Sequence, residues 1–329
     1  MANAGVIGAG SWGTALSVLL HKNGHQVTVW SIDENEVKML NEKREHESKL
    51  PGVKIPQDMV ITGDLEETVR GRDFLVMAVP SPFTRTTARK MKPYVAEGQI
   101  IVDVAKGIEE DTLLTLSRQI EEEIPQADVA VLSGPSHAEE VGRGLPTTCV
   151  IGAKTKETAE YLQSMFISNV FRVYTSPDVL GIELGGSLKN VMALAAGIAD
   201  GLGYGDNTKA ALITRGIAEI ARLGVKMGGK IESFSGLTGI GDLIVTCAYG
   251  QFVPQPLLDH PRCGAVNLHA SLLPRLRGAA PIQRAIMQGD KTCGMSVMRM
   301  VKKMDAGAVM AQRGIPIEED DTSGTMFAK

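Results

Sequence analysis

The first fifteen residues constrain the fold of this chain more than any other stretch. Residues 4–7 are small and apolar, Gly8, Gly10 and Gly13 follow with G-x-G-x-x-G spacing, and a second apolar run begins at Ala15. Between a strand and a helix, such glycines permit a tight turn, close approach of a pyrophosphate to the backbone, and close packing of helix on strand. The helix N-terminus adds N–H groups and a positive dipole. The sequence therefore predicts a dinucleotide-binding turn at the start of an α/β fold.

Apolar runs that alternate with helical patterns extend this prediction to a whole domain. Continuous apolar strands separated by helices are typical of a doubly wound parallel sheet covered on both faces. We expect further strands at 26–30, 73–79, 99–105, 128–132, 147–151 and 170–174. The loops at their carboxyl ends should line the ligand crevice. The dinucleotide-binding domain is predicted to span residues 1–176.

The end of the second strand bears on which dinucleotide is bound. Ser31, Ile32 and Asp33 stand where such folds place either an acid that binds the ribose or an arginine that binds a 2′-phosphate. Because Ile32 is not an arginine, the sequence favours NAD. Asp33 is equally suited to cap a helix that begins at Glu34, and the residue pattern leaves both roles open.

A stretch rich in glycine and alanine, residues 181–216, contains an isolated lysine. Lys189 and Asn190 lie among small residues that would let a helix approach a partner or a ligand closely. These small residues are Gly185, Gly186, Ala193, Ala196 and Gly197. Close helix packing with a lysine that reaches to water explains the same spacing. We expect a truncated all-helical substrate domain over residues 177–247.

The composition excludes several classes of protein. With 329 residues, 43% of them hydrophobic, and a net charge of −4, the chain has an ordinary soluble composition and no broad basic surface for nucleic acid. No apolar run reaches the roughly 20 residues of a membrane span. The four cysteines lack the spacing of a zinc site or a disulfide framework. We therefore expect a cytoplasmic protein with no metal, no membrane and no nucleic-acid partner.

Residues 4–247 resemble the NAD(P)-dependent glycerol-3-phosphate dehydrogenases. The motifs that carry the resemblance are the glycine turn, Ala-Lys-Gly-Ile at 105–108, Glu-Leu-Gly-Gly-Ser-Leu-Lys-Asn at 183–190, and residues 195–216. The resemblance implies an oxidoreductase of phospholipid biosynthesis that interconverts sn-glycerol 3-phosphate and dihydroxyacetone phosphate, with NAD or NADP as hydride carrier. It also leaves a homodimer open.

The same resemblance implies roles for individual residues. Lys189 would be the catalytic proton donor, and Asp242 would pair with it and orient it. Substrate would be bound by Lys106, Asn190 and Thr246. Cofactor would be bound by Gly8, Gly10, Ser11, Trp12, Gly13, Ser31, Pro80 and Lys106. Burial lowers a lysine pKa and a carboxylate raises it, so the Lys–Asp pair could tune the amine; an ordinary buried ion pair is the structural alternative.

The resemblance to the dehydrogenases stops after Cys247. The family continues with a Ser-Arg-Asn segment and further helices, whereas Gln251 and Phe252 stand here about where the arginine and asparagine belong. That arginine contacts the anionic ligand in the family, and loss of such a buried charged partner costs about 2–5 kcal/mol of binding. We therefore expect NADH to bind while turnover is low.

Residues 248–329 resemble the middle of methionyl-tRNA formyltransferase and are predicted to form an α/β fragment. The motif that begins at Asn267 and His269 continues Ala-Ser-Leu-Leu-Pro, and Asp305 follows 36 residues after the histidine. The resemblance makes these three residues the counterparts of the formyltransferase catalytic group. The first strands of that enzyme and its later tRNA-binding domain have no counterpart here, so we expect no formyl transfer. Residues 242–251 suit either family.

Three interpretations follow from these resemblances. The first is a cytoplasmic glycerol-3-phosphate dehydrogenase, impaired by its replaced C-terminus, whose partner is the small-molecule substrate. The second is a formyltransferase fragment, and the third is a non-catalytic chimera that binds a dinucleotide. The sequence leaves open whether the junction is natural or an error of sequence assembly.

Overall fold

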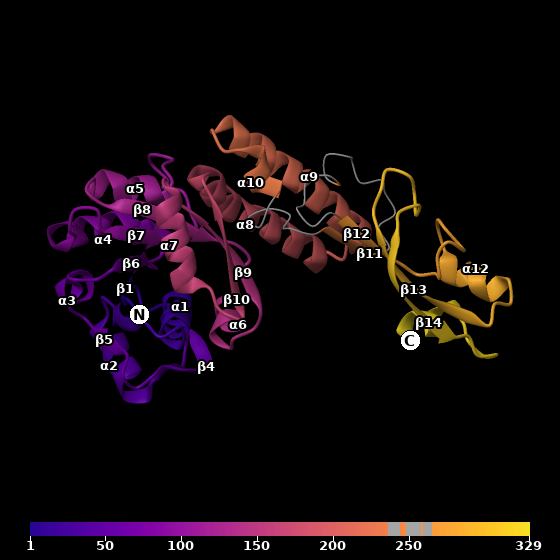
Figure 1. Ribbon diagram of the computed structural model, residues 1–329, viewed down its shortest axis with the longest axis horizontal. Helices are drawn as coiled ribbons and strands as arrows, with labels where there is room; N and C mark the ends of the chain where they lie inside the picture. The colour runs from indigo at the N-terminus through magenta and orange to yellow at the C-terminus, as the bar shows by residue number, and fades with distance from the viewer. Residues whose placement is uncertain (236–243, 248–257, 259–264) are drawn as a thin grey trace. The chain divides into compact units, whose positions relative to one another are not determined.

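The computed structural model describes residues 1–235, 244–247, 258 and 265–329 (Figure 1). The chain divides into two compact units, Met1–Gly239 and Ile240–Lys329. Each unit has its own sheet, and each is described by itself.

The first unit is built on one large sheet. In spatial order its described strands are β10 Phe171–Ser176, β9 Thr147–Gly152, β8 Asp128–Ser133, β7 Ile100–Asp103, β6 Phe74–Met77, β1 Asn3–Ile7, β2 Gln26–Trp30 and β5 Val60–Thr62. Neighbouring strands from β8 to β5 pair in parallel, as the sequence predicts. The strands β9 and β10 pair in parallel with each other, but β9 is antiparallel to β8. The expectation of a wholly parallel sheet is therefore corrected at this edge.

Helices cover both faces of this sheet and create two separate cores. One face packs against α1 Ser11–Lys22, α2 Glu34–Lys43, α6 Ala138–Gly142 and α7 Lys156–Phe166. The other packs against α3 Leu65–Val69, α4 Thr84–Met91 and α5 Leu116–Glu123. Neighbouring strand residues face opposite cores: Val6 lies in the first and Ile7 in the second. Because both faces are buried, the strands read as continuous apolar runs.

Short elements complete the crossovers. The strands β3 Glu45–His46 and β4 Leu50–Lys54 form a small antiparallel pair after α2. The short 3-10 helices η1 Ser81–Phe83 and η2 Lys92–Tyr94 flank α4. The side chain of Asp33 accepts a hydrogen bond from the Asn35 N–H and caps α2, so the structure shows the capping role that the sequence left open.

Three helices follow the sheet within the first unit: α8 Val179–Gly201, α9 Gly205–Lys226 and α10 Ile231–Ser235. Asp178 caps α8 through the Gly181 N–H, and its second oxygen accepts hydrogen bonds from the Lys230 N–H and the Ser233 hydroxyl. One carboxylate therefore joins the start of α8 to the start of α10.

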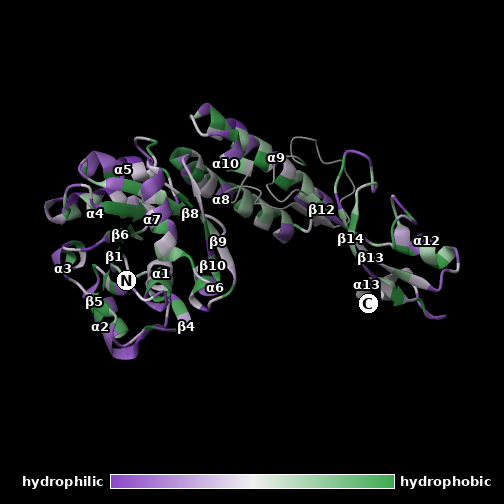
Figure 2. Cartoon of the chain, in the orientation of Figure 1, coloured by the Kyte–Doolittle hydropathy of each residue, from purple (hydrophilic) through white to green (hydrophobic). Residues whose placement is uncertain are grey.

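The helix α8 is buried at its start and exposed along its later turns. Residues 181–186 are buried, whereas Val191, Leu194 and Ile198 are more than half exposed, and green apolar residues lie along α8 and α9 in Figure 2. Among the residues described, α8 alone is long and apolar enough to cross a membrane, a criterion that core helices of soluble proteins also meet. Of the five small residues, Gly185 and Gly186 are buried, Ala196 is half-buried, and Ala193 and Gly197 are exposed.

The second unit contains a smaller mixed sheet. Its described strands, β11 Ile244–Cys247, β12 Ala265–His269, β13 Thr292–Arg299 and β14 Val309–Pro316, lie in this order. The pair β11–β12 is parallel and the other two pairs are antiparallel. The helices α12 Pro281–Met287 and α13 Ser323–Ala328 pack together beside β13.

The junction between the two resemblances forms a strand of the second unit. Residues 244–247 pair with β12, so they do not continue the helical domain, and the structural boundary lies at 239/240 instead of the predicted 247/248. Pairing with β12 supplies hydrogen bonds along one edge of this segment, and its β-branched residues suit a strand.

Candidate active site

The glycine turn after β1 has the form that a dinucleotide requires. Gly8 has a φ of +118°, and a Cβ at Gly13 would lie 1.9 Å from the Gly8 carbonyl oxygen. A Cβ at Gly10 would meet no atom within 4 Å. Gly10 is also the N-cap of α1 and offers no side-chain hydrogen bond, so the first N–H groups of this helix are left for a ligand. The residues present therefore fit a bound pyrophosphate.

Two lysines from different elements converge on the loop that follows β8. Lys189, on α8, donates a hydrogen bond of 2.8 Å from Nζ to the Gly134 carbonyl oxygen. Lys106, in the loop after β7, donates one of 3.2 Å from Nζ to the Ser136 hydroxyl. The Ser136 hydroxyl in turn donates to the Gly134 carbonyl. The sequence predicts that the loop after this strand lines the ligand crevice, but it does not single out Gly134 and Ser136 as the residues that the two lysines contact.

Small residues permit the close approach of α8 to these loops. A Cβ at Gly186 would lie 2.5 Å from the Ser133 hydroxyl oxygen, so only glycine fits there without movement. At the next residue, the Ser187 hydroxyl bridges the N–H and the carbonyl of Gly107. The loop that contains Lys106 is therefore fastened to the helix that contains Lys189.

The glycine turn lies next to the lysine pair. The Lys106 Nζ lies 5.9 Å from the ring centroid of Trp12, in the first turn of α1. The Trp12 ring is held by a hydrogen bond of 3.1 Å from Nε1 to the Val104 carbonyl. The predicted cofactor residues Gly8, Gly10, Ser11, Trp12 and Gly13 thus share one sheet edge with Lys106.

The electrostatics of the site make both lysines easier to deprotonate. Burial lowers the pKa of Lys189, and the charge of Lys106 lowers it further. Burial also lowers the pKa of Lys106. Cys149, on the neighbouring strand β9, gives the lysines no negative charge, because burial raises the pKa of its thiol to about 12. Both amines therefore release a proton more readily than a solvated lysine does.

Two buried carboxyl groups near this site were not singled out from the sequence. Asp103, the last residue of β7, is fully buried, and its Oδ2 has no hydrogen-bond partner among the described residues. Burial raises the pKa of Asp103 well above its usual value, and the charge of Glu183 adds to this. Glu183 accepts hydrogen bonds from the N–H and hydroxyl of Ser117, at 2.9 and 2.5 Å. An acid at the end of an apolar strand was the signal for Asp103.

For the remaining predicted dehydrogenase residues that it describes, the structure gives no side-chain hydrogen bond to either of the two lysines. Asn190 is exposed on α8, and Pro80 is exposed just before η1. Ser31 is buried at the end of β2, where its hydroxyl donates to Glu36. Asp242, the predicted partner of Lys189, lies outside the described residues.

Thr246 belongs to the second unit instead of the helical domain. It lies on β11, where its hydroxyl donates a hydrogen bond of 2.9 Å to the Asn267 Oδ1. The structure therefore assigns Thr246 a partner in the formyltransferase-like sheet, and its predicted contact with a dehydrogenase substrate is not supported.

The formyltransferase-like residues lie together in the second unit. His269 Nδ1 is 3.9 Å from the Asp305 Oδ2, and Asn267 is two residues before His269 on the same strand. The other ring nitrogen of His269 contacts the Leu276 carbonyl at 3.0 Å, and Asp305 accepts a hydrogen bond from the Gly278 N–H. In this arrangement both groups are engaged in holding the 276–278 loop.

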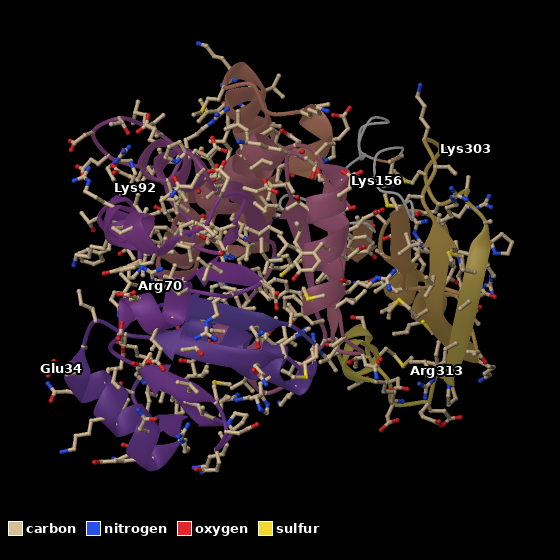
Figure 3. The ribbon with its side chains drawn as sticks, turned by 60° about the vertical axis from the view of Figure 1, so that its left-hand side comes forward. Glu34, Arg70, Lys92, Lys156, Lys303 and Arg313 are labelled. Atoms are coloured by element: carbon tan, nitrogen blue, oxygen red, sulfur yellow. The ribbon has the colours of Figure 1, made fainter. Side chains whose placement is uncertain are left out.

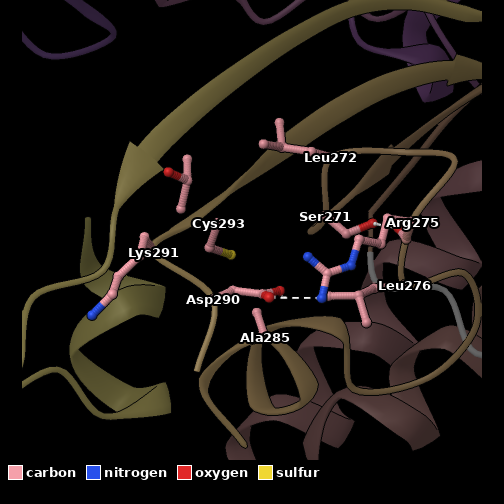
Figure 4. A pocket seen from close by; sticks show the side chains of 9 residues that line it. Ser271, Leu272, Arg275, Leu276, Ala285, Asp290, Lys291 and Cys293 are labelled. Atoms are coloured by element: carbon pink, nitrogen blue, oxygen red, sulfur yellow. Dashed lines mark hydrogen bonds and ion pairs between the residues drawn. The ribbon is translucent and has the colours of Figure 1, made fainter. Parts of the chain in front are cut away.

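A pocket of about 320 Å³ lies elsewhere in the second unit (Figure 4). The ion pair between Arg275 and Asp290, 2.6 Å long, crosses its wall, and the buried thiol of Cys293 faces the same region. None of the three formyltransferase-like residues lines this pocket. Among the described His, Cys, Asp and Glu residues, no cluster has the arrangement of a metal site.

A glycine turn at the start of a doubly wound sheet, with one lysine after β7 and a second from α8 beside it, is typical of an NAD(P)-dependent dehydrogenase. The comparisons agree with this class. Residues 3–159 match the N-terminal model of NAD-dependent glycerol-3-phosphate dehydrogenase, and residues 178–251 match its C-terminal model. The chain belongs to the glycerol-3-phosphate dehydrogenase family.

Individual relatives support this assignment. The chain is 69% identical over 247 residues to glycerol-3-phosphate dehydrogenase [NAD(P)+] of Agathobacter rectalis, covering 75% of this chain and 74% of the relative. It is 59% identical over 250 residues to the Fusobacterium nucleatum protein of the same name, covering 75% of each. Among solved structures, glycerol-3-phosphate dehydrogenase from Coxiella burnetii matches with a TM-score of 0.70 and 36% identity, covering 73% of this chain and 74% of that one.

The C-terminal part matches a different family. Residues 238–329 match the formyl transferase model, which overlaps the dehydrogenase match over residues 238–251. The resemblance of the chain to two families, with a shared stretch at the junction, is thus confirmed.

Proposed function

We propose that this chain binds NADH or NADPH and reduces dihydroxyacetone phosphate to sn-glycerol 3-phosphate, with activity limited by its replaced C-terminal quarter. The observation that carries the proposal is the convergence of Lys106 and Lys189 on the 134–136 loop, beside the glycine turn. Family membership supplies the substrate, because the relatives bear the name of this dehydrogenase.

The side chains of the site supply the polar part of this reaction. When bound, the nicotinamide supplies the hydride. The two ammonium groups attract the substrate phosphate and favour negative charge on the ketone oxygen. Lys189, directed by its hydrogen bond to Gly134, would give that oxygen its proton and become a neutral amine. Burial and the charge of Lys106 both ease this proton release.

The replaced C-terminus would limit the reaction. Dehydrogenase resemblance ends near the junction, where Gln251 and Phe252 stand in place of the family's arginine and asparagine. Without that arginine, the cations that the described residues offer to the phosphate here are Lys106 and Lys189. A high KM for the substrate would follow.

Oxidation of NADH by the full chain, measured with and without dihydroxyacetone phosphate, tests the proposal. We expect slow, substrate-dependent oxidation that falls about 100-fold or more in Lys189→Met, since a positioned proton donor contributes about 10²–10⁴-fold. Lys156→Met is the matched control, because the side chain of this α7 lysine is 79% exposed (Figure 3). Undiminished reduction by Lys189→Met would refute the proposed proton donor.

The same preparation distinguishes the alternative functions. NADH binding without turnover would support a dinucleotide-binding chimera. Formyl transfer from 10-formyltetrahydrofolate would support the formyltransferase fragment, and we expect none, because both His269 and Asp305 are engaged with the 276–278 loop.

A further inference from the structure

A buried polar cluster closes the end of β2. Glu36, in the first turn of α2, accepts hydrogen bonds from the Ser31 hydroxyl at 2.5 Å and from the Lys49 Nζ at 2.5 Å. His46 Nε2 lies 2.9 Å from the same carboxylate. The side chains of Glu36 and His46 are only 11% and 1% exposed. Three groups from the end of β2 and from the segment after α2 thus hold one carboxylate.

This carboxylate is held in its ionised form. Burial by itself would raise the pKa of Glu36, but hydrogen bonds from Lys49, Ser31 and His46 outweigh burial and keep the pKa below its usual value. The Lys49 backbone N–H donates to His46 Nδ1, which places the proton of a neutral His46 on Nε2, where it can be donated to Glu36. The N-terminus of α2 adds a favourable dipole. An ionised carboxylate, paired with the Lys49 ammonium, therefore lies beside Ser31.

The position of this charge matters because doubly wound folds place the adenosine ribose at the end of the second strand. A ribose 2′-hydroxyl is neutral and can donate a hydrogen bond to a carboxylate or to a serine oxygen. A 2′-phosphate has only acceptor oxygens and at least one negative charge. Ser31 cannot serve it, because its hydroxyl proton is donated to Glu36, and the Lys49 ammonium is already paired with Glu36.

We propose that Glu36, fixed by Ser31, His46 and Lys49, makes this chain select NADH over NADPH. This inference rests on the proposed function, which requires that the chain binds a dinucleotide. It adds the residue that discriminates between NADH and NADPH. Asp33, on the same loop, caps α2 through its side chain and adds negative charge without a donor. Ile32 is 71% exposed and offers no positive charge.

Binding titrations of the full chain, followed by nicotinamide fluorescence, test this inference without relying on turnover. Wild-type protein should bind NADH about tenfold or more tightly than NADPH at low salt. Glu36→Gln should reduce this ratio to nearly one, mainly by tightening NADPH, because it removes the repulsion and frees Lys49 for the 2′-phosphate. Lys49→Met should act in the opposite direction and weaken NADPH further.

Glu34→Gln is the matched control. It removes the same charge from the first turn of the same helix, and Glu34 is exposed and points outward in Figure 3. Its NADH to NADPH ratio should remain that of the wild type.

The outcomes separate this inference from the proposed function. Equal binding of NADH and NADPH by the wild type, or an unchanged ratio in a folded Glu36→Gln protein, would overturn the role of Glu36 alone. Binding of neither cofactor by the wild type would overturn both proposals. Circular dichroism of each variant shows whether it is folded.

Discussion

Lys189 illustrates how a single residue acquires its chemistry from its surroundings. An exposed lysine would keep its ordinary pKa, but Lys189 lies half-buried with Lys106 nearby, and both effects lower its pKa below 10.5. A proton donor for ketone reduction must be charged, whereas the reverse reaction needs the neutral amine. The burial of one side chain therefore sets the pH range of each direction.

We expect reduction of dihydroxyacetone phosphate to decline with rising pH before pH 10.5 is reached, and glycerol 3-phosphate oxidation to rise over the same range. Rate profiles in both directions measure this. Lys106→Met should move the decline to higher pH, because it removes the neighbouring positive charge. A decline that does not move in Lys106→Met would contradict the electrostatic explanation.

Asp103 is a second residue whose surroundings determine its effect. Its folded-state pKa is raised well above the unfolded value near 3.8, so the folded chain binds the proton more tightly. Its contribution to stability is therefore present below about pH 4 and is lost as pH rises through the folded-state pKa.

The variant Asp103→Asn should raise the melting temperature at pH 8, because it removes an ionisable group from a fully buried position where Oδ2 has no partner in the described structure. The gain should be about 1–3 kcal/mol and should vanish near pH 4. Thermal melts at both pH values decide the matter, and equal gains at both would argue against ionisation as the cause.

At the scale of the element, the turn between β1 and α1 contains one glycine that is needed for folding and another that is needed for binding. Gly13 is required for the contact of helix and strand, since a Cβ there would overlap the backbone of Gly8. Gly10 has an ordinary φ of −63°, and its missing side chain leaves open space. Gly13 is therefore needed for packing, whereas Gly10 leaves space for a ligand.

We expect Gly13→Ala to destabilise the first unit by about 1–3 kcal/mol, as overpacked sites do. For Gly10→Ala, the free energy of unfolding should stay within roughly a few tenths of a kcal/mol of that of the wild type. NADH should nevertheless bind at least about tenfold more weakly, because the methyl group would occupy the space of the pyrophosphate. Melting curves and NADH titrations of the pair are the measurement. Normal NADH affinity in Gly10→Ala would refute the assignment of this turn.

At the scale of the whole molecule, the chain consists of two units with separate sheets and cores, divided at 239/240. The chain spans about three quarters of the length of the curated relatives it matches, and its residues 238–329 match the formyl transferase model. The two units thus match different families, and each has its own sheet.

Calorimetry should accordingly show two unfolding transitions. NADH at about 100 times its Kd should stabilise only the first unit, by about 2.7 kcal/mol, which corresponds to roughly 5–10 °C for a unit of this size. The transition of the second unit should not move. A single transition that shifts as a whole with NADH would show instead that the units unfold together.

The sequence by itself determined the doubly wound sheet, the glycine turn and the presence of two families, because strand periodicity, glycine spacing and motif order are local properties of the chain. Only the tertiary structure decided which groups meet: Lys106 and Lys189 on one loop, Glu36 with Ser31, His46 and Lys49, and the reversed strands β9 and β10. It also moved Thr246 into the second sheet, since pairing with β12 fixes the junction as a strand. Contacts between distant segments, and the burial that shifts pKa values, arise only when the chain is packed.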